Sequence, residues 1–311
     1  MSDRKVSAFH YAPAPKVAFY TYPEWAFGSI HEALCREFYN HGVLAHIIDW
    51  NRPYSAQDLE SFVKQYDTFV TVPGNAITLL NTCFNVPNEK IIAIAHGRYD
   101  LEYGIKENNR YDDLKGFGVI GHPLKAFSRE LGISREPVIL HNGVHFDLFY
   151  SEPPLSLSTL GYGGVISYPS FDKSREIKRG YLAKEVSEKT GLPLKLVEPR
   201  NFLTMPSFYK QVDCTLLTSS EESWGLPMIE TAASGRLPMG TCVGVFQIFD
   251  GFGRALPIDG REFVRSASEE LNRLVKDPET FNKECRRAQE FVRYSLDWKF
   301  VIDDWLRLVV S

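Results

Sequence analysis

The sequence predicts an α/β protein with two doubly wound domains, each built on a parallel sheet. With 311 residues the chain is longer than one hydrophobic core usually serves, so two domains are expected. Compact apolar runs alternate with helical patterns over the first half, which indicates strand–helix units in series. A segment rich in Pro, Ser and Gly follows at residues 152–164, and the alternation starts again behind it.

The first half begins after a polar, Pro- and Ala-rich stretch at residues 1–15, for which we expect a loosely attached tail. Helical patterns follow the first apolar run, recur around residues 56–65 and return after Asn75. The buried strands are expected at residues 17–20, 43–48, 68–72, 90–95, 117–121 and 138–141. Helical crossovers make such strands parallel, so the loops that follow the strands gather at the carboxyl edge of the sheet.

The second half repeats this order. Strands are expected at residues 164–168, 194–197, 213–217 and 237–241, and helices at residues 206–213, 227–234, 262–276 and 279–293. Asp277-Pro278 is a cap-and-first-turn signal for the last of these helices, and residues 242–253 are expected to form a loop. A final apolar stripe at helical spacing consists of Trp298, Val301, Ile302, Trp305, Leu308 and Val309. This stripe indicates a packing helix.

The most informative stretch runs from Asp213 to Gly235. A short buried strand enters a loop rich in hydroxyl and acidic residues, and Pro227 is expected to open a helix because its missing N–H would be unpaired there anyway. Gly235 can end that helix in a left-handed cap. A strand, a Gly-containing loop and a helix N-terminus together form an anion site, since unpaired amides and the helix dipole favour negative charge.

Two acids, Glu222 and Glu230, flank the predicted anion site. A carboxylate does not bind an anion, but it accepts hydrogen bonds from hydroxyl groups that lie beside one. A ligand that combines an anionic group with neighbouring hydroxyl groups is a nucleotide sugar. The alternative is that Glu222 is a solvated loop acid and that Glu230 merely suits the first turns of a helix.

The run at residues 222–238, with its two acids and the Gly-Leu-Pro between them, resembles the Glu–seven residues–Glu motif of retaining GT-B glycosyltransferases. Residues 142–149 are similar to the segment that ends the N-terminal domain in this family, with His145 in place of the usual Asp. The resemblance implies two Rossmann-like domains that face each other across a cleft. The implied parts are an acceptor domain at residues 16–152, a donor domain at residues 153–295 and a helix that crosses back to the first domain at residues 296–311.

The resemblance also implies roles within the motif. Glu222 would hold hydroxyl groups of the transferred sugar, and Glu230 would hold the ribose hydroxyl groups of the nucleotide. The backbone groups implied to face the sugar or the phosphates are those of Gly225, Leu226, Pro227 and Met228. Glu198 lies in the loop after the strand at residues 194–197, which would cover the nucleotide base.

In the first half, His96 follows a buried strand directly, where ligand sites of α/β proteins collect. It resembles the family histidine that contacts the transferred sugar. The alternative is a histidine that only hydrogen-bonds the backbone at a strand end. Gly28 is the single glycine in the loop at residues 22–29, where the family often has a Gly-rich turn near the donor phosphates.

Basic residues are expected beside the diphosphate, because breaking the sugar–phosphate bond leaves negative charge on the departing group. In the family a Gly-Arg pair supplies the first cation, but Ser167 and its neighbours stand at that place here. Lys178 and Arg179 are the best counterpart of the Lys-Gly that follows, and Lys173 or Arg175 would supply the other charge. The alternative is that these residues form a solvated basic face.

Composition argues against several other classes of function. A net charge of −4 gives no electrostatic footprint for nucleic acid, so a nucleic acid acceptor is disfavoured. The five cysteines have no metal-site or redox spacing, and we expect small buried thiols in a reducing compartment. No apolar run suggests a signal peptide or a membrane helix, so a cytoplasmic protein is expected. No metal is expected, since the helix dipole and side-chain cations would do its work.

The prediction is a retaining transferase that moves a hexose from a nucleoside diphosphate sugar, with UDP-glucose as the default donor, to the hydroxyl group of a small molecule, a glycan or another polymer. No carboxylate nucleophile stands out in the first half, so a front-face displacement is expected, in which the protein positions the reactants and stabilises charge. Two alternatives stay open: a nucleotide-sugar epimerase on the same fold, and a non-catalytic module that binds nucleotide sugars.

Overall fold

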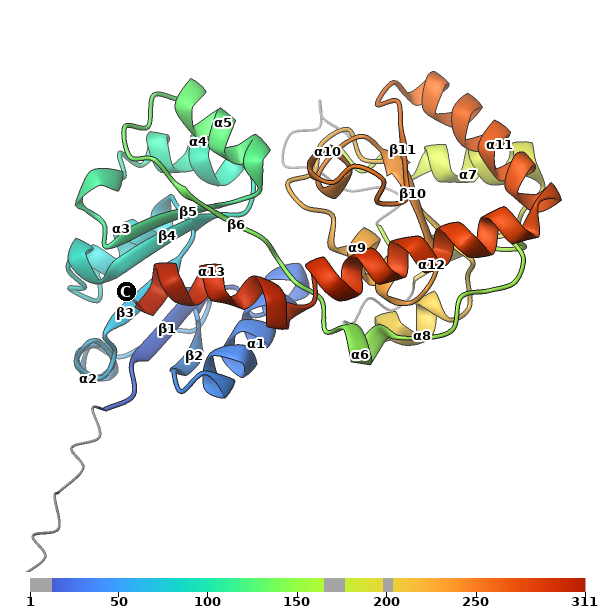
Figure 1. Cartoon of the computed structure of the whole chain (residues 1–311). Helices are drawn as coiled ribbons and strands as arrows, with labels where there is room; N and C mark the ends of the chain where they lie inside the picture. The colour runs from blue at the N-terminus through green and yellow to red at the C-terminus, as the bar shows by residue number, and fades with distance from the viewer. Residues whose placement is uncertain (1–12, 165–176, 198–203, 311) are drawn as a thin grey trace, which may run out of the picture.

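The computed structural model describes residues 13–164, 177–197 and 204–310. It shows two α/β domains side by side, with the last two helices running from the second domain to the first (Figure 1). The predicted fold class is therefore confirmed. Ser167, Lys173, Arg175 and Glu198, which the sequence suggested as donor-site residues, lie outside the described residues.

Over the described residues, the sheet of the first domain has six strands in the order β2-β1-β3-β4-β5-β6, and all pairs are parallel. The strands are β1 (Lys16–Thr21), β2 (Leu44–Asp49), β3 (Thr68–Thr71), β4 (Ile91–Ala95), β5 (Gly116–Ile120) and β6 (Val138–Leu140). The helices are α1 (Trp25–Asn40), α2 (Ala56–Gln65), α3 (Asn75–Thr82), α4 (Arg98–Lys106) and α5 (His122–Glu130), with 3₁₀ turns η1 (Asn88–Lys90) and η2 (Tyr111–Asp113). The short helix α6 (Phe146–Phe149) follows in the domain connection and lies against α9 (Leu226–Ala233) of the second domain. Every residue of β4 and β5 is buried, because helices cover both faces of a parallel sheet.

The second domain holds, within its described part, a parallel sheet of five strands in the order β11-β10-β9-β7-β8. The strands are β7 (Leu160–Tyr162), β8 (Leu194–Leu196), β9 (Cys214–Leu217), β10 (Leu237–Thr241) and β11 (Arg254–Leu256). The helices are α7 (Tyr181–Thr190), α8 (Met205–Tyr209), α9 (Leu226–Ala233), α10 (Val245–Ile248), α11 (Gly260–Lys276) and α12 (Pro278–Ser295), and the chain then crosses to the first domain in α13 (Trp298–Val310).

The structure corrects four expected elements. The first strand that the structure describes in the second domain is β7, which lies inside the segment predicted as a linker. Of the strand expected at residues 164–168, residues 165–168 lie outside the described residues. The helix expected at residues 206–213 ends at Tyr209, and the loop expected at residues 242–253 contains α10. Helix α9 starts at Leu226, one residue before Pro227.

The C-terminal helix packs on the first domain, as predicted. Trp305 of α13 is fully buried, and its indole Nε1 donates to the carbonyl of His141, 2.8 Å away, directly after β6. The chain segment before α13 also pairs with the domain connection, since the Val144 amide donates to Leu296 O at 2.9 Å and the Trp298 amide to Val144 O at 3.2 Å. The two crossings between the domains are thus hydrogen-bonded to each other.

Gly143 allows these crossings to approach closely. A Cβ at this position would lie 2.7 Å from Trp298 Cδ2 and 2.9 Å from Trp298 Cα, and the backbone at Cα cannot move aside cheaply. We expect Gly143→Ala to lower the free energy of unfolding by about 1–3 kcal/mol, as overpacking does. Thermal unfolding tests this, with Gly97→Ala as the control, because a Cβ there has its nearest neighbour at 3.7 Å. Equal melting temperatures for the two variants would contradict it.

The cysteines are all free, but they are not all buried as expected, since Cys83 is exposed. Among the residues that the structure describes, no helix is both long enough and apolar enough to cross a membrane.

Candidate active site

The stretch that the sequence singled out forms a strand, a loop and a helix, namely β9, residues 218–225 and α9. Gly225 is the N-cap of α9 with φ +87° and ψ 58°, a left-handed conformation that side chains other than glycine adopt at a cost. Gly235 follows the last turn of α9 with φ +70°, so the predicted left-handed cap is confirmed. These two glycines fix where the helix begins and ends.

Neighbouring elements hold the loop at residues 218–225 in place. The Thr241 hydroxyl at the end of β10 donates to Ser219 O at 2.6 Å, and the Val245 amide of α10 donates to Trp224 O at 2.8 Å. From the other side, the Ser220 amide donates to Ile177 O at 2.8 Å. The loop is therefore built before any ligand arrives, as a binding site of low reorganisation cost requires.

Glu222 and Lys178, two of the predicted catalytic residues, form an ion pair through Glu222 Oε1. The Ser219 hydroxyl donates to the same oxygen at 2.8 Å. The side chains are 16% and 34% exposed for Glu222 and Lys178 respectively, so both reach solvent only in part. The structure thus brings a cation and a carboxylate together beside the start of α9.

Glu230, on the second turn of α9, is buried with 7% of its surface exposed. The Tyr209 hydroxyl of α8 donates to Glu230 Oε2 at 2.8 Å. Burial raises the pKa of this carboxyl to about 7, and the hydrogen bond from Tyr209 opposes that rise by favouring the charged form. Glu230 therefore titrates near neutral pH.

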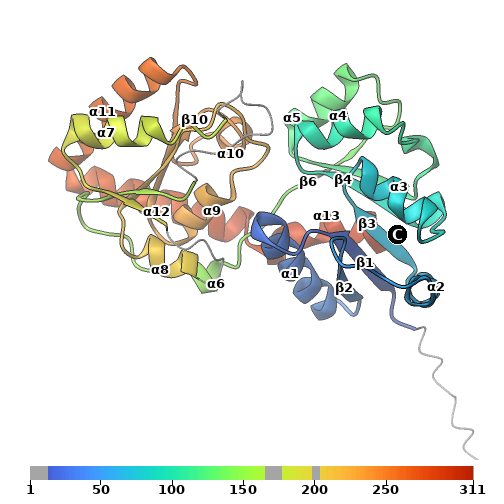
Figure 2. The ribbon, with the colours of Figure 1, turned by 180° about the vertical axis from the view of Figure 1, so that it is seen from behind.

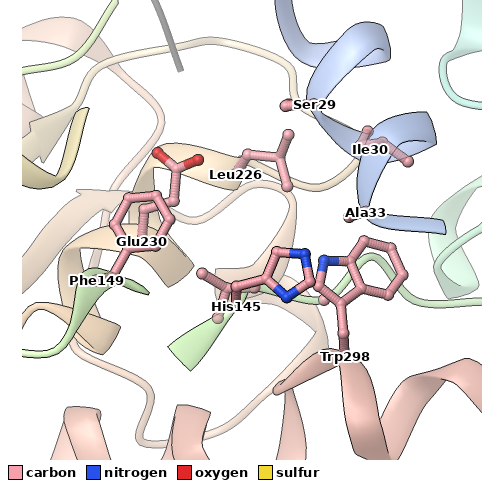
Figure 3. Close-up of a pocket in the computed structure, with 10 residues that line it drawn as sticks. Ser29, Ile30, Ala33, His145, Phe149, Leu226, Glu230 and Trp298 are labelled. Carbon is pink, nitrogen blue, oxygen red and sulfur yellow. The ribbon is translucent and has the colours of Figure 1, made fainter. Parts of the chain in front are cut away.

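Glu230 also lines a small pocket between the two domains. Figure 3 shows Leu226 and Glu230 of α9 on one side of this pocket and Ser29, Ile30 and Ala33 of α1 on the other. The remaining lining residues come from the domain connection, α6 and the start of α13, and they are Gly143, Val144, His145, Phe149 and Trp298. Viewed from behind, α1 lies at the edge of the first domain that faces the second domain (Figure 2).

The carboxyl edge of the first sheet lies close to the same loop. A Cβ on Gly97, after β4, would lie 3.7 Å from Ser223 Oγ, and one on Gly121, after β5, would lie 3.7 Å from Ser223 O. Arg98 Nε lies 3.8 Å from Glu221 Oε1, with both side chains about half exposed. The loop at residues 218–225 therefore stands opposite the strand ends at which His96 is placed.

His96 lies in a group of aromatic rings on the first domain. Its ring centroid is 5.0 Å from that of Phe27 and 5.9 Å from that of His31, while its backbone amide donates to Asp100 Oδ2 at 2.7 Å. Burial lowers the pKa of His96 to about 3, and that of His31 to about 4. Both imidazoles are neutral at pH 7, and Nδ1 of the buried His31 is hydrogen-bonded to Phe27 O at 2.8 Å.

Two predicted residues have other structural work. The guanidinium of Arg179 donates to three backbone carbonyl oxygens, those of Thr218 at 2.8 Å, Ile258 at 2.8 Å and Ser219 at 3.1 Å, so it holds the loop. Gly28 belongs to the first turn of α1, where a Cβ would collide with the carbonyl oxygen of Pro23. Glycine at position 28 thus allows the first turn of α1 to pack closely against the backbone at Pro23.

The four backbone positions at the start of α9 differ in what they can offer. Pro227 has no N–H, and the Met228 amide already donates to Gly225 O at 2.9 Å. An anion at this helix end would therefore use the amides of Gly225 and Leu226. A Cβ on Gly163, just after β7, would lie 3.4 Å from Pro227 Cβ, which places the end of β7 beside this helix start.

Sequence reasoning missed two contacts of this region. Tyr209 hydrogen-bonds Glu230, and no signal in the chain links positions 21 residues apart. His141, directly after β6, stacks on Trp224 of the loop with ring centroids 5.0 Å apart and planes at 24°. Within the described residues, no group of three or more His, Cys, Asp or Glu side chains is arranged to hold a metal ion.

No protein-family model matches the sequence, and no curated protein matches it. Solved structures do share its fold. The structure of Anabaena HepE in complex with UDP and glucose has a TM-score of 0.71 at 11% identity, and the match covers 96% of this chain and 100% of that chain. Sucrose-phosphate synthase from Thermosynechococcus elongatus has a TM-score of 0.64 at 15% identity, covering 94% of this chain and 98% of its own.

A glycosyltransferase from Rickettsia africae has a TM-score of 0.62 at 14% identity, over 96% of this chain and 98% of its own. At such identities the likeness establishes the architecture, and this architecture is the GT-B fold that the sequence predicted.

Proposed function

We propose that this protein is a glycosyltransferase that moves a sugar from a nucleoside diphosphate sugar to an acceptor hydroxyl group. The observation that carries the proposal is the pair of acids on one preformed loop-and-helix unit, Glu222 beside Lys178 and Glu230 beside the interdomain pocket. A fold shared with a structure that holds UDP and glucose supports it. UDP-glucose is the default donor.

Glu230 would hold the ribose of the nucleotide. A carboxylate accepts about four hydrogen bonds, so the one from Tyr209 leaves capacity for two ribose hydroxyl groups. The diphosphate would then lie at the start of α9, where the amides of Gly225 and Leu226 and the positive end of the helix dipole favour an anion.

Lys178 and Glu222 would act on the reacting centre. As the sugar–phosphate bond breaks, the ammonium of Lys178 meets the charge that develops on the diphosphate, and Glu222 holds sugar hydroxyl groups. His96, whose imidazole is neutral at pH 7, would contact the sugar from the first domain. We infer a front-face displacement with retention, in which the departing phosphate accepts the proton of the acceptor hydroxyl, without a metal ion.

The proposal predicts that UDP, GDP or ADP binds the protein in the absence of divalent ions. Isothermal titration with each nucleotide measures this, and donor hydrolysis assays with the matching sugar nucleotides follow. An absence of heat with all three nucleotides would refute the proposal.

Product analysis separates the two alternatives from the transferase. An epimerase changes the sugar of the donor with no acceptor present. A non-catalytic module binds the donor but gives neither hydrolysis nor transfer with any acceptor.

A further inference from the structure

We propose that Tyr209 is a positioning residue for Glu230. Its hydroxyl group fixes one oxygen of the carboxylate, so that the carboxylate faces the ribose hydroxyl groups of the donor. The inference rests on the proposed function, because Tyr209 would influence the affinity of that same site for the nucleotide although it lies outside the motif.

The surroundings of Tyr209 hold it at both ends. The residue is fully buried, and its ring packs against Phe149 and Phe208 with centroid distances of 6.0 Å and 5.3 Å. Its carbonyl oxygen accepts a hydrogen bond from Nε of the buried Arg236 at 3.0 Å. Because its backbone and ring are held in place, the hydroxyl group of Tyr209 has little freedom to move. It donates to Glu230 Oε2 at 2.8 Å and so restricts the position of that oxygen as well.

The hydroxyl group also lies where the donor is expected. A Cβ on Gly163, at the end of β7, would lie 3.7 Å from the Tyr209 hydroxyl oxygen and 3.4 Å from Pro227 Cβ. The hydroxyl group is therefore beside the start of α9, at the carboxyl edge of the second sheet, where ligands of doubly wound domains bind. A phenylalanine would fill the same apolar space, so packing alone does not account for the hydroxyl group.

The hydrogen bond bears on the charge of Glu230. Burial disfavours the carboxylate, and the Tyr209 hydroxyl group favours it, so the pKa of Glu230 stands at about 7. The other titratable side chain on this pocket is His145 of the domain connection, whose Nδ1 lies 3.8 Å from Glu37 Oε1 and whose pKa is lowered by burial. The α1 residues that line the pocket carry no charge. Tyr209 therefore helps to keep Glu230 ionised at neutral pH.

The test compares UDP with its 2′,3′-dideoxy analogue, which lacks both ribose hydroxyl groups. Tyr209→Phe should raise the Kd of UDP about five- to tenfold, the loss of one hydrogen bond to a charged group, and should change the Kd of the analogue less than about twofold. UDP affinity of the unaltered protein should also fall as the pH is lowered through about 7, since only ionised Glu230 binds. In the variant that fall should begin at a higher pH.

Controls separate positioning from general damage. Tyr111→Phe removes a buried hydroxyl group in the first domain and should change neither Kd. In a Glu230→Gln background, Tyr209→Phe should have no further effect on UDP. Equal weakening of UDP and the analogue, or an unchanged pH midpoint, would overturn the positioning role while leaving the proposed function in place. Failure of the unaltered protein to bind UDP, GDP and ADP would overturn both.

Discussion

Lys178→Met is expected to lower turnover about a hundred- to a thousandfold, which is the usual loss when one preorganised group that meets transition-state charge is removed. The ammonium of Lys178 forms an ion pair with Glu222 beside the start of α9, so it is next to the expected position of the diphosphate. Methionine keeps the length and most of the apolar stem but carries no charge. The fold should survive, because partly exposed ion pairs contribute little to stability.

Steady-state kinetics with the donor identified by titration measures this effect as kcat and KM. The matched control is Lys189→Met on α7. Lys189 is 52% exposed and forms an ion pair with Glu185 at 3.4 Å, and it has no proposed role in binding or catalysis. The control should retain full turnover. If Lys178→Met kept more than about a third of kcat while binding UDP normally, the proposed role of Lys178 would be wrong.

Glu230→Gln is expected to weaken UDP binding about tenfold and, at pH 8, to stabilise the unliganded protein. The first effect follows from the loss of charge-assisted hydrogen bonds to ribose. The second follows from linkage. The folded pKa of about 7 lies above the ordinary value of 4.5, so folding favours the protonated acid. The contribution of protonated Glu230 to the stability of the fold is therefore present at low pH and is lost as the pH rises from 4.5 through 7.

Above pH 7 the buried carboxylate therefore reduces stability by up to about 3 kcal/mol, and glutamine removes this penalty. Denaturant unfolding of Glu230→Gln and of the unaltered protein at pH 5 and pH 8 measures the difference, with exposed Glu188→Gln of α7 as the control. The variant should gain stability mainly at pH 8. A loss of stability at pH 8, or an equal change at both pH values, would show that ionised Glu230 does not destabilise the folded protein.

The strand–helix order of both domains was predictable because buried parallel strands are continuous apolar runs, as at residues 91–95 and 116–120. Strand β7 was missed because Leu160–Tyr162 is short and lies among prolines, serines and glycines. Strand β11 was missed for a similar reason, since its three residues include Arg254 and follow several glycines.

The strand, the loop and the helix at residues 213–235 could be predicted from the sequence, since Pro227 and the Gly235 cap are local signals in the chain. The contacts that tune the acids were not readable. Tyr209 reaches Glu230 only through the packing of α8 against α9, and Lys178 reaches Glu222 across 44 residues. Arg179 looked like a phosphate ligand by its neighbours in the sequence, but folding directs its guanidinium to backbone carbonyl groups.

The most direct test of the central claim is a crystal structure of the protein with UDP bound, grown without divalent ions. We predict that the ribose hydroxyl groups lie within hydrogen-bond distance of Glu230, that the diphosphate lies at the amides of Gly225 and Leu226, and that Lys178 has turned from Glu222 towards it. UDP bound elsewhere, with Glu230 contacting only Tyr209 and Lys178 still on Glu222, would contradict the assignment.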